Sequence, residues 1–276
     1  MSTTTSIKKY LRKQFFPTIW CAGCGNGIVL GAILRAIENI GWEKDNIVMV
    51  SGIGCSSRTP GYVDFNTLHT THGRSIGFAT GVKFANPDFK VIVVTGDGDA
   101  TAIGGNHFIH AARRNIDLTV ILFNNYIYGM TGGQGSPTTP VGSKSTTTPY
   151  GNIDNPFDIS RLAVAAGASY VARGTVYHAT ALNKLIENGM RKKGFSLIET
   201  LVNCQTYYGR PNDLKTPIRL LKWFKENSLS VKAADKLPPE KVKGKFLTGV
   251  FADIDKPEFC ESYKKLVDKV SVNGGN

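Results

Sequence analysis

The stretch TGDGDATAIGGNHF, residues 95–108, places Asp97 and Asp99 in a glycine-rich turn directly after the apolar run VIVV. Carboxylate oxygens suit a hard cation, and glycines let the backbone approach a ligand closely. The next apolar run, LTVILFNN, ends in Asn124 and Asn125. Each motif alone is also compatible with a tight turn or with the end of a strand. Together they predict a magnesium and phosphate site, with Asp97 and Asn125 sharing the cation.

The five cysteines form a second set of candidate ligands: Cys21, Cys24, Cys55, Cys204 and Cys260. Their odd number, in a chain that shows no secretion signal, argues against a disulfide framework. Four thiolates are required by a cubane iron-sulfur cluster. Structural zinc usually takes its ligands from two close pairs rather than from one C-x-x-C and two distant single cysteines. A cluster, a zinc site and unrelated buried thiols therefore all remain open on spacing alone, and Cys260 receives no role.

Alternating strands and helices must position these residues. We expect buried strands at residues 46–52, 89–96, 118–125 and 195–203, where apolar runs rich in β-branched residues end in polar or glycine residues. Apolar stripes predict helices at 26–40, 74–85, 102–114 and 178–190. The fold class is therefore α/β, a doubly wound and mainly parallel sheet. Its strands end at one edge, where such sheets bind ligands, and the helix beginning near Thr101 would direct free amides toward a phosphate there.

Two segments fall outside this alternation. Residues 131–156 are too rich in Gly, Pro, Ser and Thr for a packed element, and a loop of this length is usually functional or disordered. From about Lys215 the chain is rich in lysine with scattered prolines. We therefore predict an α/β domain at 1–212 and an irregular C-terminal extension at 213–276, which packs on the domain or on a partner.

The chain carries a net charge of +12, with Lys8, Lys9, Arg12 and Lys13 near its start. Such basicity is compatible with nucleic acid, a membrane surface or an acidic protein partner, although it is more often a solvated surface. The apolar runs are too short to cross a bilayer. These features predict a cytoplasmic protein.

The stretch GDGDATAIGGNHFIHAARRNIDLTVILFNN resembles the thiamine diphosphate motif, a Gly-Asp-Gly followed by an Asn pair. In that family the Asp, the second Asn and a main-chain oxygen two residues later bind magnesium. The resemblance carries these roles to Asp97, Asn125 and Ile127. A dinucleotide-binding fingerprint does not fit, because the third glycine is missing.

The segments WCAGCGNG, GIGCSSR, THGR and LVNCQTYYG resemble the β subunit of 2-oxoacid:ferredoxin oxidoreductases, over residues 15–212. This resemblance implies the pyrophosphate-type domain fold and one [4Fe-4S] cluster on Cys21, Cys24, Cys55 and Cys204, near thiamine diphosphate. It also implies the cofactor contacts Ile53, Gly54, Cys55, Ser56, His72, Gly96, Gly98, Asp99, Ala100, Gly129 and Met130.

The implied reaction is the coenzyme A-dependent oxidative decarboxylation of a 2-oxoacid, or its reverse, with electrons passing to ferredoxin. The stretch IYGMTGGQGSPTTP resembles the 2-oxoglutarate branch, and Arg58 is a candidate partner for the distal carboxylate of that substrate. Pyruvate is the alternative substrate. A basic iron-sulfur or zinc protein that binds nucleic acid is a more remote alternative, which would leave Asp97 and Asn125 without a role.

The resemblance also implies a partner. Thiamine diphosphate enzymes bind their cofactor between two domains, one holding the diphosphate and metal, the other supplying a glutamate to the pyrimidine. This chain shows only the first kind of domain. We therefore expect a larger α subunit that supplies the glutamate and the coenzyme A contacts, in an αβ or α2β2 assembly, with neither nucleic acid nor a membrane as partner.

Overall fold

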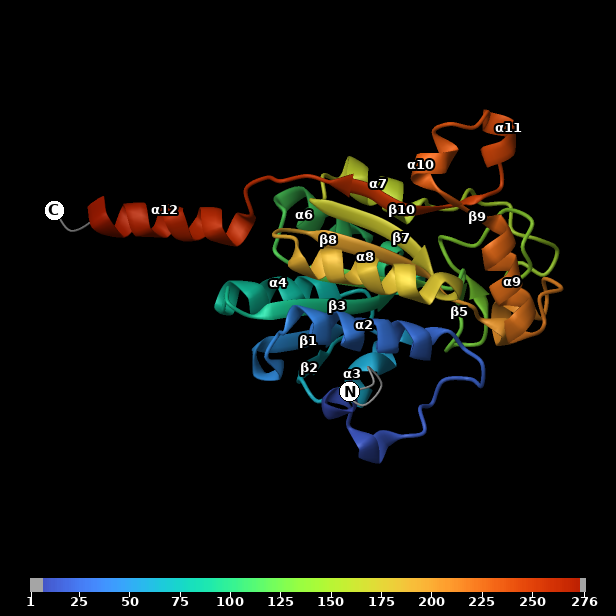
Figure 1. The fold of residues 1–276 in the computed structure, drawn as a ribbon, viewed down its shortest axis with the longest axis horizontal. Helices are drawn as coiled ribbons and strands as arrows, with labels where there is room; N and C mark the ends of the chain where they lie inside the picture. The colour runs from blue at the N-terminus through green and yellow to red at the C-terminus, as the bar shows by residue number, and fades with distance from the viewer. Residues whose placement is uncertain (1–6, 274–276) are drawn as a thin grey trace.

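A computed structural model describes residues 7–273 as an α/β fold around one central sheet (Figure 1). The sheet has eight strands in the spatial order β2, β1, β3, β4, β8, β7, β10, β9. In that order they span Asn66–His69, Ile47–Ser51, Lys90–Gly96, Thr119–Asn124, Ser196–Leu201, Tyr170–Thr175, Phe246–Asp253 and Ser228–Ser230. The first six run parallel to one another, and β10 pairs with β7 antiparallel. The mainly parallel α/β fold is therefore confirmed.

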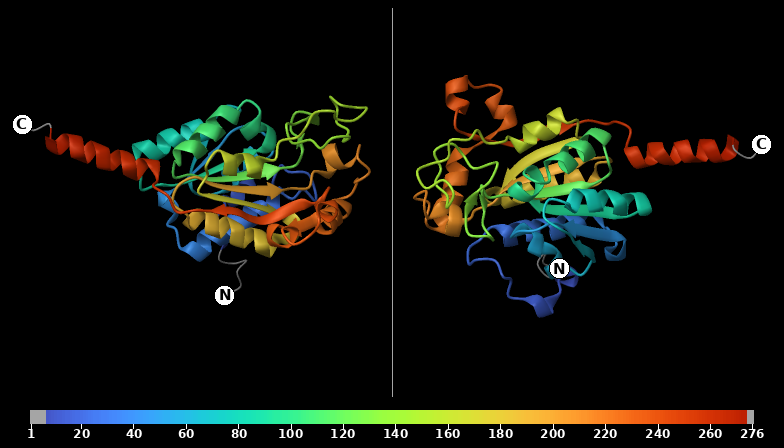
Figure 2. Two further views of the ribbon diagram at one scale, coloured as in Figure 1. Left: turned by 90° about the horizontal axis from the view of Figure 1, so that it is seen from above. Right: turned by 180° about the vertical axis from the view of Figure 1, so that it is seen from behind.

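Helices cover both faces of the sheet (Figure 2). The longer helices are α2 (Asn26–Ile40), α4 (Ser75–Ala85), α6 (Gly105–Arg114), α7 (Ile159–Ala165), α8 (Ala179–Arg191), α9 (Pro217–Asn227) and α12 (Phe259–Asn273). Short helices are α3 (Thr59–Tyr62), α5 (Asp97–Thr101), α10 (Val231–Ala234) and α11 (Pro239–Val242). Single turns are η1 (Ile7–Tyr10), η2 (Lys13–Phe15), η3 (Lys44–Asn46), η4 (Ser56–Arg58), η5 (Val176–His178) and the π-helical η6 (Gln205–Gly209). No described helix has both the length and the apolar character needed to span a membrane.

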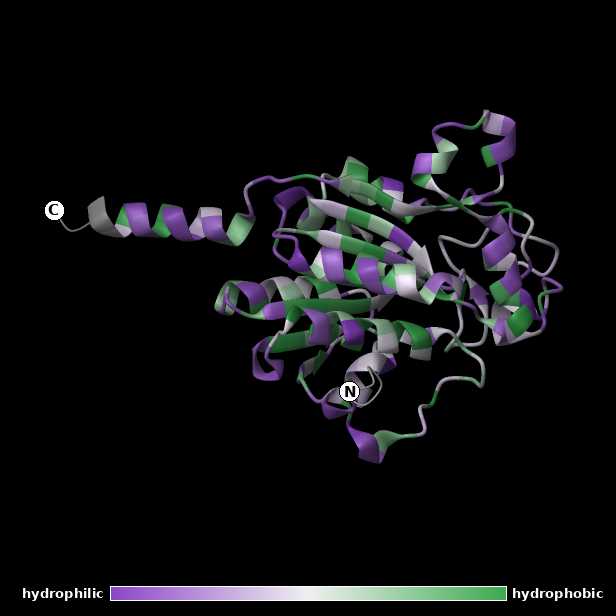
Figure 3. Cartoon of the chain, viewed as in Figure 1, coloured by the Kyte–Doolittle hydropathy of each residue, from purple (hydrophilic) through white to green (hydrophobic). Residues whose placement is uncertain are grey.

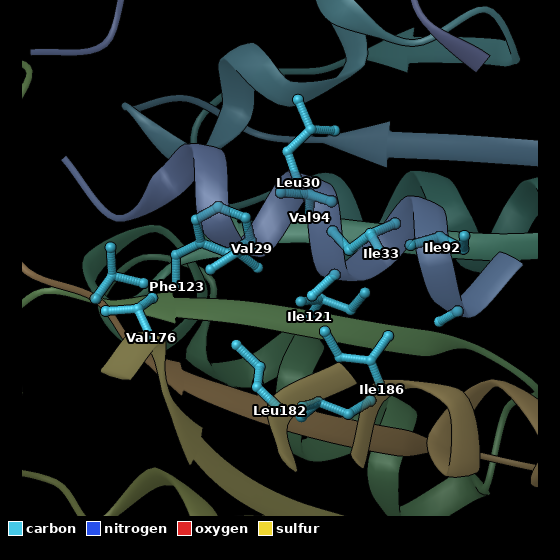
Figure 4. Packing of buried hydrophobic residues seen from close by; sticks show 14 of the residues in the cluster. Val29, Leu30, Ile33, Ile92, Val94, Ile121, Phe123, Val176, Leu182 and Ile186 are labelled. Carbon is cyan, nitrogen blue, oxygen red and sulfur yellow. The ribbon is translucent and has the colours of Figure 1, made fainter. Parts of the chain in front are cut away.

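Strands β3 and β4 are buried on both faces, which explains their continuous apolar sequences (Figure 3). On β3, Ile92 and Val94 join the core beneath α2 and α8, where the helices contribute residues such as Ile33 and Ile186 (Figure 4). The alternate residues of β3 join a second core beneath α4, α6 and α7. The two cores hold the central strands, and therefore the carboxyl edge, in a fixed arrangement.

The expected strands correspond to β1, β3, β4 and β8, and the helix expected at 26–40 is α2. The prediction that a long helix begins near Thr101 is wrong. A short helix, α5, begins at Asp97 and ends at Thr101, and α6 begins only at Gly105. Thr101 Oγ1 donates to the carbonyl of Asp97 at 2.7 Å, which closes this first turn on itself. Helix α6 therefore does not direct free backbone amides from Thr101 toward a phosphate, because its first turn lies four residues later.

The expectation of an irregular extension is also corrected, because the described residues after 212 form α9 to α12 and the strands β9 and β10. Strand β10 pairs with β7 and continues the main sheet. Helix α12 projects away from the rest of the molecule (Figure 1). The long loop at 131–156 contains only the two-residue β6 (Gln134–Gly135), which pairs with β5 (Ile127–Tyr128). Residues 1–6 and 274–276 of the two predicted domains lie outside the described residues.

Candidate cofactor and thiol site

The functional candidates meet at the carboxyl edge of the sheet, because Gly96 at the end of β3 lies opposite Phe123 of the neighbouring β4. A cavity of about 290 Å³ opens there. It is lined by Asp97, Asn125 and Ile127, the three predicted magnesium ligands. Ten of the eleven predicted cofactor contacts also line it: Ile53, Gly54, Cys55, Ser56, His72, Gly96, Gly98, Asp99, Gly129 and Met130. The eleventh, Ala100, is buried and is not among the lining residues.

Asp97 follows β3 directly and is 3% exposed. Its Oδ2 accepts hydrogen bonds from Ser136 Oγ at 2.5 Å and from Thr138 Oγ1 at 2.6 Å. Burial raises the pKa of this carboxyl to about 6, although the two hydroxyls oppose the shift by stabilising the anion. A buried carboxylate of this kind is well suited to a cation that would compensate its charge.

The two asparagines after β4 serve different purposes. Asn125 lines the cavity, and its Oδ1 accepts a hydrogen bond from the backbone N–H of Ile127 at 3.2 Å. Asn124 is buried, and its Nδ2 donates to Glu199 Oε1 at 2.8 Å. The second asparagine is therefore available to a ligand, while the first anchors the turn to the neighbouring strand β8.

Tyr126, between the two predicted ligands Asn125 and Ile127, has a φ of 65°, a left-handed conformation that is costly for a bulky residue. Its buried ring lies 5.4 Å from the Tyr208 ring and 6.2 Å from the Phe246 ring, between ring centroids. Phe246 belongs to β10. The C-terminal segment therefore helps to hold the turn that carries the predicted metal ligands.

Asp99 organises the walls of the cavity. Its Oδ1 accepts hydrogen bonds from the backbone N–H of Gly73 at 2.7 Å and of Ile53 at 3.3 Å, and Thr95 donates to Oδ2 at 2.7 Å. His72 Nδ1 lies 2.7 Å from Oδ1. These contacts occupy the carboxylate, so that Asp99 fixes the loops of residues 53 and 72 on either side of the turn.

Four residues that were not predicted from the sequence also line the cavity: Asn26, Phe123, Tyr128 and Thr131. Asn26 is 1% exposed, and its Nδ2 has no hydrogen-bond partner, as is also true of Ser56 Oγ. A Cβ on Gly98 would lie 2.2 Å from the Tyr128 ring, so only glycine fits beneath that ring. The position of Asn26 directly after C-x-x-C-G was a usable signal, whereas nothing local marked Tyr128.

Cys21, Cys24, Cys55 and Cys204 line a second cavity of about 240 Å³. The two cavities share Cys55, Asn125, Gly129 and Met130 as lining residues. A Cβ on Gly129 would lie 3.6 Å from Cys55 Sγ and 3.8 Å from Cys204 Sγ. The structure therefore brings the four predicted cluster ligands together beside the first cavity.

Burial raises the pKa of Cys24 to about 12 and that of Cys55 to about 11, and it also raises the pKa of Cys204. These thiols hold their protons firmly, and a metal that binds them must displace those protons. Within residues 7–273, no three His, Cys, Asp or Glu side chains are arranged to hold a single metal ion. Cys260 is separate, since it is buried in the core beneath α4 and α6.

Arg58, the candidate substrate ligand, lies at the end of η4, the turn that follows Cys55. It is exposed and is not among the lining residues of either cavity. Its proposed contact with a substrate therefore remains a prediction.

Comparison with known proteins tests the resemblance. A family model described as "Thiamine pyrophosphate enzyme, C-terminal TPP binding domain" matches residues 52–200. The 2-oxoglutarate synthase subunit KorB of Methanothermobacter marburgensis is 56% identical over 95% of this chain and 92% of its own length. The protein of the same name from Methanocaldococcus jannaschii is 55% identical, over 95% and 97%.

A solved structure, described as 2-oxoglutarate:ferredoxin oxidoreductase from Magnetococcus marinus with 2-oxoglutarate, coenzyme A and succinyl-CoA bound, has a TM-score of 0.86 at 33% identity. The match covers 96% of this chain and 91% of that one. The resemblance is confirmed, and the chain belongs to the thiamine pyrophosphate enzymes and, among them, to the β subunits of 2-oxoacid:ferredoxin oxidoreductases most similar to the 2-oxoglutarate branch.

Proposed function

We propose that this subunit takes part in the coenzyme A-dependent oxidative decarboxylation of 2-oxoglutarate to succinyl-CoA, or in its reverse, with electrons leaving through one [4Fe-4S] cluster to ferredoxin. The observation that carries this proposal is the pair of neighbouring cavities with shared lining residues, one lined by candidate oxygen ligands and the other by four cysteines. The names of the relatives and the ligands of the Magnetococcus marinus structure support 2-oxoglutarate over pyruvate.

The residues of the first cavity fit thiamine diphosphate with magnesium. Asp97, Asn125 and the carbonyl of Ile127 would supply the oxygen ligands of the cation that neutralises the diphosphate. The buried Asn26 Nδ2 and Ser56 Oγ have no partner within the chain, which suits a cavity that receives a polar ligand. When bound, thiamine diphosphate supplies the carbanion and the electron sink for decarboxylation.

The second cavity fits a cubane cluster. In a cubane the four thiolates bind different iron atoms rather than one ion, and the four cysteines would supply them from the walls of one cavity. The shared wall of Cys55 and Gly129 would place the cluster beside the cofactor. Electron transfer between the two groups would require such proximity, and the protein's part would be to hold them together and to exclude water.

The glutamate expected at the pyrimidine is not among the residues that line either cavity in the described chain. The subunit names of the relatives imply a larger assembly. The α subunit would therefore supply that carboxylate and the coenzyme A contacts. The mouth of the first cavity carries the exposed side chains Ile53 and Met130, which suits burial against a partner.

The decisive experiment compares this chain alone with the chain co-expressed with its α subunit. Both are reconstituted with iron, sulfide, magnesium and thiamine diphosphate, and 2-oxoacid-dependent reduction of a viologen dye is measured. We expect turnover with 2-oxoglutarate only in the complex. Equal turnover by the isolated chain would contradict the shared active site, and a preference of the complex for pyruvate would contradict the substrate.

A further inference from the structure

The Asp97 carboxylate is held on one side by the long loop at 131–156. Ser136 Oγ and Thr138 Oγ1 both lie within hydrogen-bond distance of the same oxygen, Oδ2, at 2.5 and 2.6 Å. Because one carboxylate oxygen accepts about two hydrogen bonds, the two hydroxyls fill the capacity of Oδ2. A cation at Asp97 must then bind through Oδ1.

Thr138 also connects Asp97 to the neighbouring strand. Its Oγ1 lies 3.0 Å from Asn124 Oδ1, which in turn accepts a hydrogen bond from the N–H of Tyr126 at 3.1 Å. The hydroxyl has one proton, and we assign it to Asp97, which is both the closer and the more strongly accepting partner. Thr138 therefore lies between the strand ends that carry the two predicted ligands, Asp97 and Asn125.

The loop is fixed well enough to act on the carboxylate. Thr139 Oγ1 donates to the carbonyl of Tyr126 at 2.6 Å and accepts from the N–H of Ser136 at 2.8 Å. Asn152 Nδ2 donates to the carbonyl of Thr139 at 2.8 Å. Thr138 and Thr139 are almost completely buried. The hydroxyls that face Asp97 therefore belong to a closed hydrogen-bonded structure and not to a free loop.

We propose that Ser136 and Thr138 are positioning residues for the metal. They orient the Asp97 carboxylate so that one oxygen is held by the loop and the other is presented to the cation on the diphosphate. This inference rests on the proposed function, and it gives the segment GSPTT a physical task that its composition alone does not reveal. Neither hydroxyl needs to touch the cofactor or the substrate.

The test uses the co-expressed complex after removal of divalent cations with a chelator. Magnesium is titrated back in the presence of thiamine diphosphate, and binding is followed by calorimetry. Thr138→Val keeps the shape of the side chain but removes the hydroxyl, and we expect it to weaken magnesium binding roughly tenfold, as expected for a hydrogen bond to a charged group. Thr138→Ser restores the hydroxyl and should restore the affinity. Ser136→Ala is a second, independent route to the same loss.

Thr147→Val is the matched control. Thr147 Oγ1 accepts from the N–H of Gly135 at 2.9 Å and lies 3.2 Å from Ser145 Oγ within the same loop, whereas the hydroxyls on Asp97 are those of Ser136 and Thr138. Wild-type affinity in Thr138→Val, an equal loss in Thr147→Val, or no recovery in Thr138→Ser would each overturn the positioning role. A wild-type complex that binds neither magnesium nor thiamine diphosphate would instead overturn the proposed function. The melting temperature and the visible absorption of the cluster show whether each variant is folded.

Discussion

The candidate site has two halves that are built in different ways: an oxygen half, with Asp97 and Asn125 at the first cavity, and a thiol half, with the four cysteines at the second. In the oxygen half, Asp97 is joined by side-chain hydrogen bonds to Thr138, and Asn124 to Glu199, at the ends of neighbouring central strands. In the thiol half, Cys21 and Cys24 come from the loop before α2, Cys55 follows β1, and Cys204 follows β8. In the oxygen half, the predicted ligand Asp97 is itself part of the hydrogen-bond network. In the thiol half, the predicted ligands lie on three separate segments.

The thiol loops are nevertheless tied together beside their ligands. Gln205 Nε2 donates to the carbonyl of Ala22 at 2.7 Å, and Asn203 Nδ2 donates to the carbonyl of Gly23 at 2.8 Å. Trp20 Nε1 donates to the carbonyl of Cys55 at 2.7 Å. These bonds bring the segments together without using the sulfurs. The oxygen half is therefore assembled without a metal, whereas the thiol half would be completed by the predicted cluster.

The largest effect should come from removing one thiol. Cys204→Ala deletes one of the four predicted cluster ligands, and we expect loss of the cluster and of viologen reduction, because the neighbouring residues offer no replacement thiolate in the second cavity. Magnesium-dependent binding of thiamine diphosphate should persist, since the hydrogen bonds of Asp97 do not involve Cys204. Iron and sulfide analysis measures the first outcome and calorimetry the second.

Cys260→Ala is the control, because Cys260 lies in the core beneath α4 and α6, apart from both cavities. It should retain one full cluster per chain. A fully occupied cluster in Cys204→Ala, or two clusters in the wild type, would show that the four thiols are not the ligand set. Simultaneous loss of thiamine diphosphate binding would show that the two halves are not separately built.

The sequence predicted the elements whose structure follows from residues close together in the chain. Strands such as β3 and β4 are buried on both faces, so their apolar runs identify them, and the ligands directly after them follow from the same pattern. Strand β7 was missed because it contains the charged Arg173, which normally indicates a surface. The structure shows why that charge is tolerated: Arg173 Nε donates to the buried Glu199 at 2.8 Å and the side chain also pairs with Asp158.

Contacts across long stretches of chain lay beyond sequence reasoning. Thr138 reaches Asp97 across 41 positions, and no local pattern connects a threonine in a Gly- and Pro-rich loop with a carboxylate after a strand. The same holds for Phe246 and Tyr126, whose ring contact connects the Lys-rich C-terminal segment to the turn after β4. Such pairings arise from the assembled sheet, which brings distant segments to one edge.

The second largest effect is expected from Glu199→Gln, which tests how far the oxygen half depends on the buried charges of Glu199 and Arg173. Glu199→Gln removes a charge that is 2% exposed and leaves Arg173 with Asp158 as its remaining acidic partner. Breaking a buried ion pair on one side costs about 3 kcal/mol of folding stability. We expect a melting temperature several degrees lower and weaker magnesium binding, because Asn124 loses its charged acceptor.

Asp64→Asn provides the comparison for that variant. Asp64 pairs with Lys44 at 2.8 Å, and both side chains are about half exposed. A surface pair of this kind is screened by solvent and contributes little to folding stability. Equal changes in the two variants, measured by thermal melting of the complex, would argue that the buried network does not hold the oxygen half.

A smaller effect is expected from Arg58→Met, which tests whether the loop of the thiol half also serves the substrate. If the guanidinium pairs with the distal carboxylate, kcat/KM for 2-oxoglutarate should fall by roughly 1.5–3 kcal/mol in transition-state stabilisation, while pyruvate turnover changes little. Steady-state kinetics on both substrates measures the difference. Equal losses on both would assign Arg58 a general role in the loop, and its exposure on η4 makes that the principal competing outcome.

The smallest effect is the pH dependence of magnesium binding to the oxygen half, which should begin near the pKa of Asp97. Burial raises the pKa of Asp97 to about 6, and magnesium would bind its ionised carboxylate. Protons therefore compete with the metal below about pH 6, and the magnesium affinity should fall about tenfold for each further pH unit. The free thiols of Cys24 and Cys55 have pKa values of about 12 and 11, so protons compete for these predicted cluster ligands throughout this range, and no change at the thiols is expected to begin near pH 6.

The metal-free complex should show the opposite trend. Because the pKa of Asp97 is higher in the folded state than the ordinary value of 3.8, folding favours its protonated form. The contribution of Asp97 to stability is therefore greatest below about pH 4 and is lost as the pH rises through 6. Asp97→Asn removes this ionisation, so the melting temperature of the metal-free variant should exceed that of the wild type at pH 7 and approach it at pH 4. A constant difference across that range, together with magnesium binding by the wild type that is unchanged between pH 7 and 5, would mean that Asp97 is not the buried acid on which the oxygen half depends.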